Sequence, residues 1–573
     1  MTYTSVELQL LKNRLESIVD DMALTVVRTA YSTILRNSMD FSTGFCDPDG
    51  RLVAQGLCLP LHLGSLPDGL AAVLSRYGDA IDEGDVFLLN DPYEGGTHLP
   101  DIYVYKPVFV DSRLLGFTTA IAHHTDIGGR VAGGNACDST EIFQEGLRIP
   151  PLKLYAAGRP VQAIFDLIER NVRVPRNTLG DLRAQLSACH IGERAVVALA
   201  EEQGYDRLQS GFSELLNYAE RLTRAEIDAL PDGRFTFTDV LDDDGIDPDE
   251  IPIAVTVEVD GSALSVDFSG TAPQVKGAIN CVASFTRSAV YACLRCLMRA
   301  DIPTNSGFFR AIDVRVPSAT IANPVPPAPV AARGLTGFRL ANAIMGALAP
   351  LAPHIVPACE VGGDTGISIG GYRADRTPFV FLEFLFCGWG GRPDRDGIDG
   401  CASVVVNFSN NPAEVVEAEY PIRILEYGFL PDTGGAGKYR GSCSIVREYR
   451  FTETLATLQI RSDRHNSRPY GLSGGKPGSP SSNILNPHAE ARRLPSKTLL
   501  NLKRGDTLRH VLAGAGGWGN PLERDPQHVL DDVRNGKVSI RSAEMHYGVA
   551  IDPDTLQIGV ARTSGLRSCS ART

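Results

Sequence analysis

The sequence predicts a large, multi-lobed α/β protein of the mixed α+β kind, with a helix at its N-terminus, mixed sheets and a strand-rich C-terminal part. Apolar residues recur at three- and four-residue spacing from Leu8 to Val26, which is the pattern of an amphipathic helix. Short β-branched and aromatic runs between Gly, Pro and Asp clusters indicate strands. The chain has 573 residues, 43% of them hydrophobic, which is enough for a large core without disulfides.

Changes of pattern divide the chain into three expected regions, residues 1–230, 231–420 and 421–573. A Pro231-Asp232-Gly233 turn marks the first boundary, where helical periodicity gives way to strands. The predicted elements are, in order, a helix over 5–30, strands at 42–45, 52–54, 86–89, 102–110 and 114–122, helices within 160–230, strands at 235–240, 253–259 and 263–268, helices near 285–299 and 338–349, strands at 422–427, 443–451 and 457–462, and a helix at 526–534. The sequence loses its pattern after about residue 554.

Charge and composition exclude several classes of protein. The net charge of -13 argues against a nucleic-acid binder, because phosphate contacts need a basic face. The most apolar stretch, 379–389, is short and contains Glu383, so we expect no membrane span. The N-terminus lacks a signal-peptide pattern and the twelve cysteines are scattered, so we expect a cytoplasmic protein with core thiols.

Two polar segments, 90–101 and 123–129, contain three of the eleven histidines and several carboxylates. His98 and Asp101 are three residues apart on a Gly- and Pro-shaped turn, and His123 or His124 can supply a third ligand while the other faces away. Imidazole nitrogen and carboxylate oxygen suit a divalent metal such as Zn or Mn. The alternative is that these are turn residues and satisfied core histidines. We favour a metal or catalytic site because both segments carry the same ligand types.

A further carboxylate, Asp40, follows the first helix and can join this cluster. It has a plain alternative as a capping residue or as an ion-pair partner of Arg36, and composition alone leaves the two open.

Motifs for nucleotide binding and for serine hydrolysis are missing from the sequence. The Gly-rich pieces, such as 474–478 and 514–519, lack the Gly-x-x-x-x-Gly-Lys-Ser/Thr pattern of a P-loop. No Gly-x-Ser-x-Gly elbow is present. If ATP takes part in the reaction, we expect another chain to bind it.

Ordered sequence matches through almost the whole chain resemble one family. They comprise residues 36–42, 90–101, 123–129, 267–271, 273–277, 335–339, 390–393, 396–397, 471–478 and 514–521. On these residues the chain resembles the hydantoinase B/oxoprolinase family, which includes β subunits of ATP-dependent hydantoinases and of caprolactamase, the C-terminal half of 5-oxoprolinase, and a subunit of acetone and acetophenone carboxylases. The resemblance implies a hydantoinase B-type fold.

The resemblance also implies a kinase-like partner subunit of the hydantoinase A type. That partner binds ATP and Mg and phosphorylates the carbonyl oxygen of a small cyclic amide or ketone, and this chain completes the reaction at a metal. Phosphorylation removes the amide resonance and supplies a good leaving group. We therefore expect a hetero-oligomer, α2β2 or larger.

The family's metal ligands correspond to Asp40, His98, Asp101 and His123 in this sequence. The implied metal is Zn, with Mn or Fe as alternatives, because nitrogen–oxygen sites discriminate poorly among them. His124, Asp126 and Glu94 are the candidate catalytic proton carriers or orienting residues, and Asp91 is a weaker one. The sequence departs from many relatives beside Arg333, in the 331–334 loop.

The expected function is hydrolysis of a hydantoin, a lactam or 5-oxoproline, a reaction at the C–N bond of a cyclic amide. The alternative is a subunit of an acetone- or acetophenone-type carboxylase, in which the metal site carries carboxyl transfer to an enolate. A non-catalytic scaffold is a third possibility, which the complete set of four ligands argues against.

Overall fold

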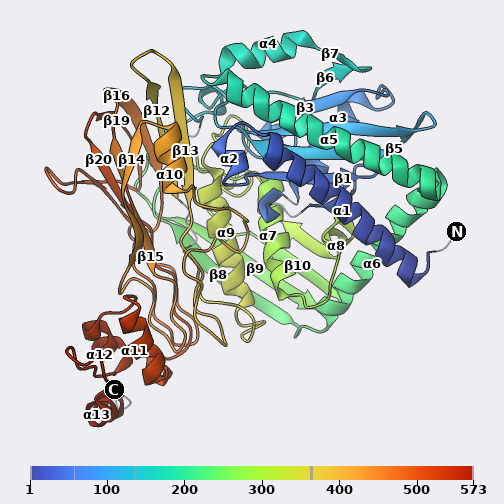
Figure 1. Cartoon of the computed structure of the whole chain (residues 1–573). Helices are drawn as coiled ribbons and strands as arrows, with labels where there is room; N and C mark the ends of the chain where they lie inside the picture. Colours follow the sequence, from blue (N-terminus) through green and yellow to red (C-terminus); the bar gives the residue numbers. More distant parts are fainter. Residues whose placement is uncertain (1–2, 57–58, 63, 135, 362–364, 571–573) are drawn as a thin grey trace.

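The computed structural model describes residues 3–56, 59–62, 64–134, 136–361 and 365–570, and its elements form a mixed α/β fold with four sheets (Figure 1). The helices are α1 Ser5–Thr29, α2 Thr33–Arg36, α3 Ser65–Tyr77, α4 Gln162–Asn171, α5 Pro175–Gln203, α6 Tyr205–Asp228, α7 Ala283–Leu297, α8 Ser306–Arg310, α9 Arg333–Leu348, α10 Ala413–Glu419, α11 Pro526–Arg534, α12 Ile540–Tyr547 and α13 Val560–Ser570. The mixed fold class predicted from the sequence is confirmed. The boundaries at residues 230 and 420 stay predictions.

The first sheet has the order β2-β1-β5-β4-β3-β6-β7 and is antiparallel throughout. Its strands are β1 Phe41–Cys46, β2 Leu52–Gln55, β3 Val86–Leu89, β4 Asp101–Val110, β5 Arg113–His123, β6 Leu152–Ala156 and β7 Arg159–Pro160. Successive side chains of a strand point to opposite faces. Tyr103 and Tyr105 of β4 therefore pack with α3 on one face, while Ile102 and Val104 join the core formed with α1 and α5 on the other.

The second sheet, β11-β10-β9-β8, packs against α9. Its strands are β8 Gly233–Leu241, β9 Ile251–Asp260, β10 Ala263–Asp267 and β11 Ile312–Arg315. The strands predicted at 253–259 and 263–268 form a hairpin, in which Asp260 pairs with Ala263. α9 in turn contacts α7, so these two helices lie between the second sheet and the first.

The third and fourth sheets share one apolar core in the C-terminal part of the chain (Figure 1). Their orders are β13-β12-β16-β19 and β14-β15-β20-β17-β18. The strands are β12 Thr365–Tyr372, β13 Pro378–Leu385, β14 Ile422–Leu430, β15 Ser444–Phe451, β16 Leu455–Arg461, β17 Ser482–Leu485, β18 Arg492–Leu494, β19 Lys497–Lys503 and β20 Thr507–Val511. The apolar stretch at 379–389 thus supplies a buried strand, β13. Among the described residues, none of the helices combines the length and the apolar character needed to cross a bilayer.

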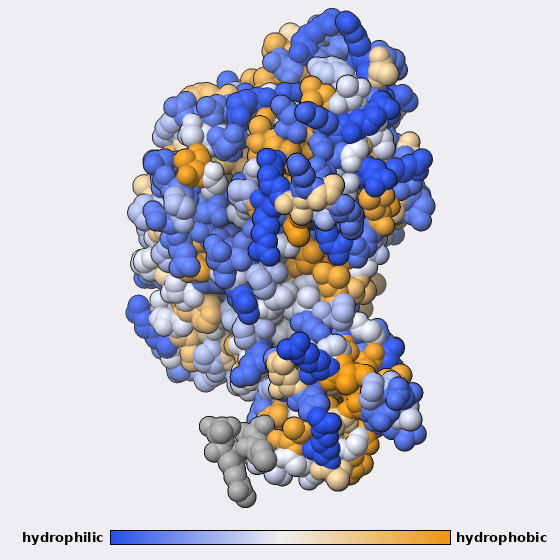
Figure 2. Space-filling view, turned by 90° about the vertical axis from the view of Figure 1, so that its left-hand side faces the viewer, coloured by the Kyte–Doolittle hydropathy of each residue, from blue (hydrophilic) through white to orange (hydrophobic). Residues whose placement is uncertain are grey.

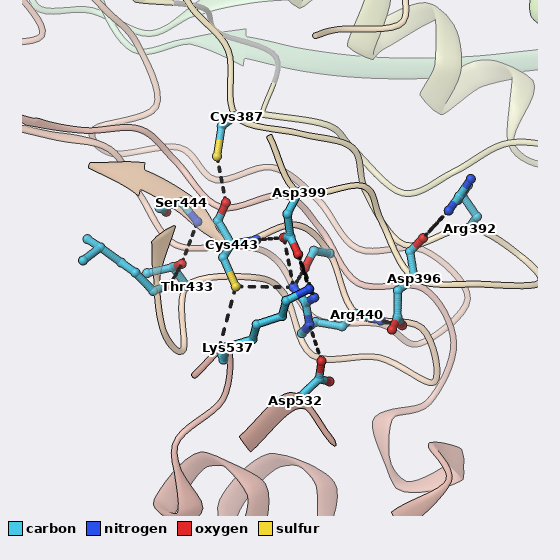
Figure 3. Close-up of polar contacts among 12 residues, drawn as sticks. Cys387, Arg392, Asp396, Asp399, Thr433, Arg440, Cys443, Ser444, Asp532 and Lys537 are labelled. Atoms are coloured by element: carbon cyan, nitrogen blue, oxygen red, sulfur yellow. Dashed lines mark hydrogen bonds and ion pairs between the residues drawn. The ribbon is translucent and has the colours of Figure 1, made fainter. Parts of the chain in front are cut away.

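Helices α11, α12 and α13 form a small C-terminal lobe that projects from the body (Figures 1 and 2). Figure 3 shows the charged network at its junction with the body. Arg440 pairs with Asp399 at 3.2 Å and with Asp532 of α11 at 3.4 Å, and Lys537 pairs with Asp399 at 2.7 Å. The stretch after residue 554, where the sequence shows no periodic pattern, nevertheless contains the helix α13, which is polar and lacks a clear apolar stripe.

Candidate metal centre

Three strands bring three of the proposed ligands into one row at the edge of the first sheet. Asp101 is the first residue of β4 and His123 is the last residue of β5, and the two pair directly in the strand register. Asp40 precedes β1, and its carbonyl accepts the backbone N–H of His123 at 3.0 Å. The carboxylate of Asp40 lies 3.7 Å from His123 Nδ1.

The β4–β5 hairpin sets this register. Asp111 and Ser112 both have positive φ, which makes a two-residue turn with the twist that hairpins favour. A bulge between Val108 and Phe109 then shifts the pairing by one residue. Phe109 pairs with Leu114, whereas Val108 pairs with Gly116. Without that one-residue shift, Ala122 would stand opposite Asp101.

His98 completes the cluster from the turn that leads into β4. Its Nε2 lies 3.0 Å from Asp101 Oδ1 and 3.2 Å from His123 Nδ1, and His123 Nδ1 lies 3.1 Å from the same carboxylate oxygen. Donor atoms of these three buried residues all lie within 4.8 Å of one another. Asp40 and His98 both lie close to His123, well inside the separation of about 10 Å that would exclude a shared site.

The hydrogen bond of His98 to the backbone leaves its other nitrogen lone pair aimed at the cluster. His98 Nδ1 lies 2.9 Å from the Ala331 carbonyl, which can only accept, so Nδ1 carries the proton and Nε2 is free to ligate. That Nε2 lone pair faces the Asp101 carboxylate, an arrangement that requires a cation or proton between them. His123 Nε2 is buried without a hydrogen-bond partner. The donor set therefore fits a divalent cation.

Burial and neighbouring charges set the protonation states. Burial lowers the pKa of His98 to about 4 and that of His123 to about 3, so both imidazoles are neutral near pH 7. Burial alone would raise the pKa of Asp101, but the charges of His98 and Arg333 and its hydrogen bonds with His123 and His62 hold that pKa well below its usual range. Burial and then the negative charge of Asp101 raise the pKa of Asp40 well above its usual range. Neutral histidines and an ionised Asp101 are the states that metal ligation needs.

A cavity of about 50 Å³ adjoins the cluster, with Asp40, His98 and His123 in its wall. Three polar residues of the wall were not predicted from the sequence: His62, Arg333 and Arg461. His62 hydrogen-bonds Ser42 Oγ through Nδ1 at 3.0 Å and lies 3.6 Å from Asp101 through Nε2. Its neighbours in the sequence are apolar, and no carboxylate lies near it in the chain, so no motif pointed to it.

Arg333, at the start of α9, pairs with Asp101 and also contacts Thr97 Oγ1 at 3.3 Å. Its guanidinium lies 4.0 Å from the centre of the Phe285 ring. The only sequence signal was its position in the 331–334 loop, where the chain departs from many relatives. Arg461 is the last residue of β16 and lies over the Phe384 ring at 4.8 Å.

The three candidate proton carriers lie outside this cavity wall. His124 follows His123, so strand alternation turns it to the other face, where its Nε2 donates to Gln185 Oε1 at 3.0 Å. The Asp126 carboxylate accepts the backbone N–H of Gly133 and pairs with Arg173 at 3.0 Å. Glu94 is exposed at the end of a short 3₁₀ turn. Their positions give no geometric support to a direct catalytic role.

The structure also decides between the structural and the functional roles that the sequence left open for Asp40 and Asp91. Arg36 pairs with Glu419 at 2.8 Å, whereas Asp40 faces His123. Asp91 caps the 3₁₀ turn through the Tyr93 N–H and pairs with Arg148 at 2.6 Å, so it acts as a turn residue.

Comparison with known proteins agrees with this architecture. Residues 4–521 match the family model described as Hydantoinase B/oxoprolinase. The chain belongs to the hydantoinase B/oxoprolinase family. It is 34% identical over 569 residues to the caprolactamase subunit beta of Pseudomonas jessenii, covering 96% of this chain and 97% of that relative.

Two solved structures share the fold. The crystal structure of the ATP-dependent caprolactamase from Pseudomonas jessenii matches with a TM-score of 0.93 and 33% identity, over 99% of this chain and 100% of that chain. A nucleotide-free acetone carboxylase structure also matches with a TM-score of 0.93, at 20% identity, over 99% of this chain and 82% of that chain. At that identity the second match shows the shared fold alone.

Proposed function

We propose that this chain is the metal-dependent subunit of an ATP-dependent cyclic-amide hydrolase of the hydantoinase, lactamase and oxoprolinase type. The observation that carries the proposal is the buried set of converging donors, His98, Asp101 and His123 with Asp40 beside them, at a cavity. Its membership of the hydantoinase B/oxoprolinase family and its likeness to a caprolactamase β subunit support the choice of substrate class.

The chemistry begins with an amide that resonance makes a poor electrophile. A kinase-like partner of the hydantoinase A type would transfer phosphate from MgATP to the carbonyl oxygen. Water then adds to the activated carbon, and the ring C–N bond breaks as the nitrogen takes a proton. A second water hydrolyses the resulting acyl phosphate to carboxylate and inorganic phosphate.

The residues of this chain would hold and orient the reactants. His98, Asp101, His123 and Asp40 would hold the divalent cation, with Zn the first choice and Mn or Fe the alternatives. When bound, such a cation supplies a Lewis acid and makes hydroxide available at neutral pH. Arg333 neutralises the Asp101 carboxylate, and the Ala331 carbonyl fixes the tautomer of His98.

Reconstitution tests the proposal. The chain purified alone should hydrolyse neither ATP nor a cyclic amide, because its sequence has no P-loop. Adding the kinase-like partner should give ATP-dependent ring opening and a stable hetero-oligomer. Robust ATP turnover by this chain alone contradicts the proposal. Incorporation of labelled bicarbonate into a ketone, without ring opening of any cyclic amide, would establish the carboxylase alternative instead.

A further inference from the structure

The two carboxylate oxygens of Asp101 have different partners. Oδ1 lies 3.0 Å from His98 Nε2 and 3.1 Å from His123 Nδ1, so it is directed at the ligand cluster. Oδ2 instead accepts a hydrogen bond from Thr97 Oγ1 at 2.5 Å and pairs with Arg333. One oxygen of this carboxylate is thus available to a cation, and the other is occupied by side chains of the protein.

The direction of the Thr97 hydroxyl is fixed by its two neighbours. Arg333 Nη2 lies 3.3 Å from Thr97 Oγ1 and can only donate, so Oγ1 accepts that hydrogen bond. The Asp101 carboxylate is ionised and can only accept, so the hydroxyl proton is directed at Oδ2. Hydrogen bonds to a charged group are stronger than those between neutral groups. Thr97 therefore holds Oδ2 with a charge-assisted bond in a single orientation.

Thr97 acts from within the same turn as the carboxylate that it holds. It lies four residues before Asp101, and the backbone N–H of Asp101 donates to the His98 carbonyl at 3.1 Å. The turn thus sets the backbone of Asp101 relative to His98, while Thr97 restrains the rotation of its carboxylate. His62 Nε2 lies farther away, 3.6 Å from Oδ2, and Arg333 reaches Oδ2 from the start of α9. Thr97 is therefore the local group that orients Asp101.

The Thr97 side chain lies away from any substrate in the cavity. It is fully buried, and it lies outside the cavity wall to which Asp40, His98 and His123 contribute. A direct catalytic role requires contact with the reacting atoms. Any effect of this hydroxyl on the site must therefore pass through Asp101 or Arg333.

We propose that Thr97 is a positioning residue of the metal centre, whose hydroxyl leaves Asp101 to bind the cation through Oδ1 alone. The hydrogen bond on Oδ2 restrains the carboxylate and opposes binding through both oxygens. Outer partners of metal ligands contribute about 10–100-fold to metal affinity. The inference rests on the proposed function, because it needs a cation at the cluster, and it adds a residue that the ligand set does not contain.

The structural alternative is that Thr97 is a turn residue whose buried hydroxyl is merely satisfied. In that case its loss lowers the stability of the metal-free chain and leaves the metal affinity of the folded chain unchanged. In the proposed role, loss of the hydroxyl weakens metal binding by a chain that remains folded. Metal affinity therefore separates the two roles.

Thr97→Val is the test, because it removes the hydroxyl and keeps the volume of the side chain. The metal-free full-length chain is titrated against a chromophoric chelator with Zn²⁺, with Mn²⁺ and, without oxygen, with Fe²⁺, so neither substrate nor partner subunit is needed. Thr97→Val should raise Kd for the metal about 10–100-fold. Thr97→Ser retains the hydroxyl and should bind nearly as tightly as the wild type.

Thr223→Val is the matched control. Thr223 is a buried threonine of α6 whose hydroxyl donates to the Ala219 carbonyl at 2.7 Å, so its loss removes the same group away from the cluster. Its Kd for the metal should equal that of the wild type. Circular dichroism and thermal melting of the metal-free chains follow folding.

Three results would overturn the inference. The first is a wild-type Kd in folded Thr97→Val, and the second is a Kd for Thr97→Ser as weak as that for Thr97→Val, since packing would then explain the loss. If Thr97→Val does not fold, Thr97→Ala is compared with Thr97→Ser, because these two differ only in the hydroxyl. Failure of both hydroxyl-free variants to fold is the third result, and it would make the hydroxyl a structural group.

The wild type separates this inference from the proposed function. A wild-type chain that binds one of the three ions, with an unchanged Kd in Thr97→Val, overturns the role of Thr97 and leaves the proposed function intact. A wild-type chain that binds none of them contradicts the metal dependence of the proposed function, and the inference falls with it.

Discussion

Asp101 and His123 stand directly opposite each other at the paired ends of β4 and β5, with His123 Nδ1 3.1 Å from Asp101 Oδ1. Asp40 continues the row on the other side of His123. The candidate metal centre is thus built on strand ends, which hold side chains more precisely than a mobile loop does. The α9 helix then brings Arg333 from a distant part of the sequence onto Asp101.

Gly366→Ala tests the position of Arg461 without changing that residue. The added Cβ would lie 2.0 Å from Arg461 Nε, so the guanidinium must move. We expect kcat/KM of the reconstituted complex to fall about 10–100-fold, as for loss of a charge-assisted contact, while the chain stays folded. Gly428→Ala on β14 is the control, because a Cβ there meets nothing within 4 Å. Equal activity of the two variants would show that the position of the Arg461 guanidinium does not affect the reaction.

Glu145 gives a pH-dependent prediction of stability. Burial raises its pKa to about 8 from the ordinary value of 4.5, and Oε1 accepts the N–H groups of Val330 and Ala331 at 2.7 and 2.9 Å. The folded chain binds this proton more tightly than the unfolded chain. The associated stability is therefore complete below pH 4.5 and is lost as pH rises through about 8.

Glu145→Gln removes this titration and keeps the acceptor for both N–H groups. The free energy of unfolding of the wild type, taken relative to that of Glu145→Gln, should fall as pH rises from 4.5 to about 8. The fall should be at most ~1.4 kcal/mol per pH unit. Melting curves of both proteins in matched buffers measure it. A difference that is constant or grows with pH is incompatible with a raised pKa at Glu145.

The C-terminal lobe depends on the buried charges shown in Figure 3. Arg440→Met would leave Asp399 and Asp532 without this partner, and breaking a buried pair costs about 3–5 kcal/mol. We expect earlier unfolding in urea and faster proteolysis within α11–α13. Arg395→Met is the matched control: its pair with Asp394 is exposed, so its loss should cost less than about 1 kcal/mol. Similar curves for the two variants would exclude a structural role for the network.

The sequence identified most of the cluster because histidines and carboxylates are concentrated in two short segments. It could not supply the one-residue bulge that aligns His123 rather than Ala122 with Asp101, since register depends on the geometry of the hairpin. Nor could it place Arg461, which reaches the cavity only because β16 pairs with β12.

Two helices show the limit of periodicity in the fold. α3 was missed because Pro67 and Gly69 interrupt its apolar pattern and its first residue follows a glycine without a capping side chain. α13 was missed because it has hardly any apolar face. Tertiary contacts, which the sequence does not display, compensate for weak local signals: a Cβ at Gly69 would lie 2.4 Å from Tyr105 Oη, so α3 packs closely on β4.

Elemental analysis of the purified chain tests the central claim most directly. The wild type and the His190→Ala control, in which an exposed histidine of α5 is removed, should each carry about one Zn, Mn or Fe ion per chain. His98→Ala should lose that metal and its ring-opening activity while remaining folded, because the site is a small part of a large core. Full metal content and full activity in folded His98→Ala would contradict the account.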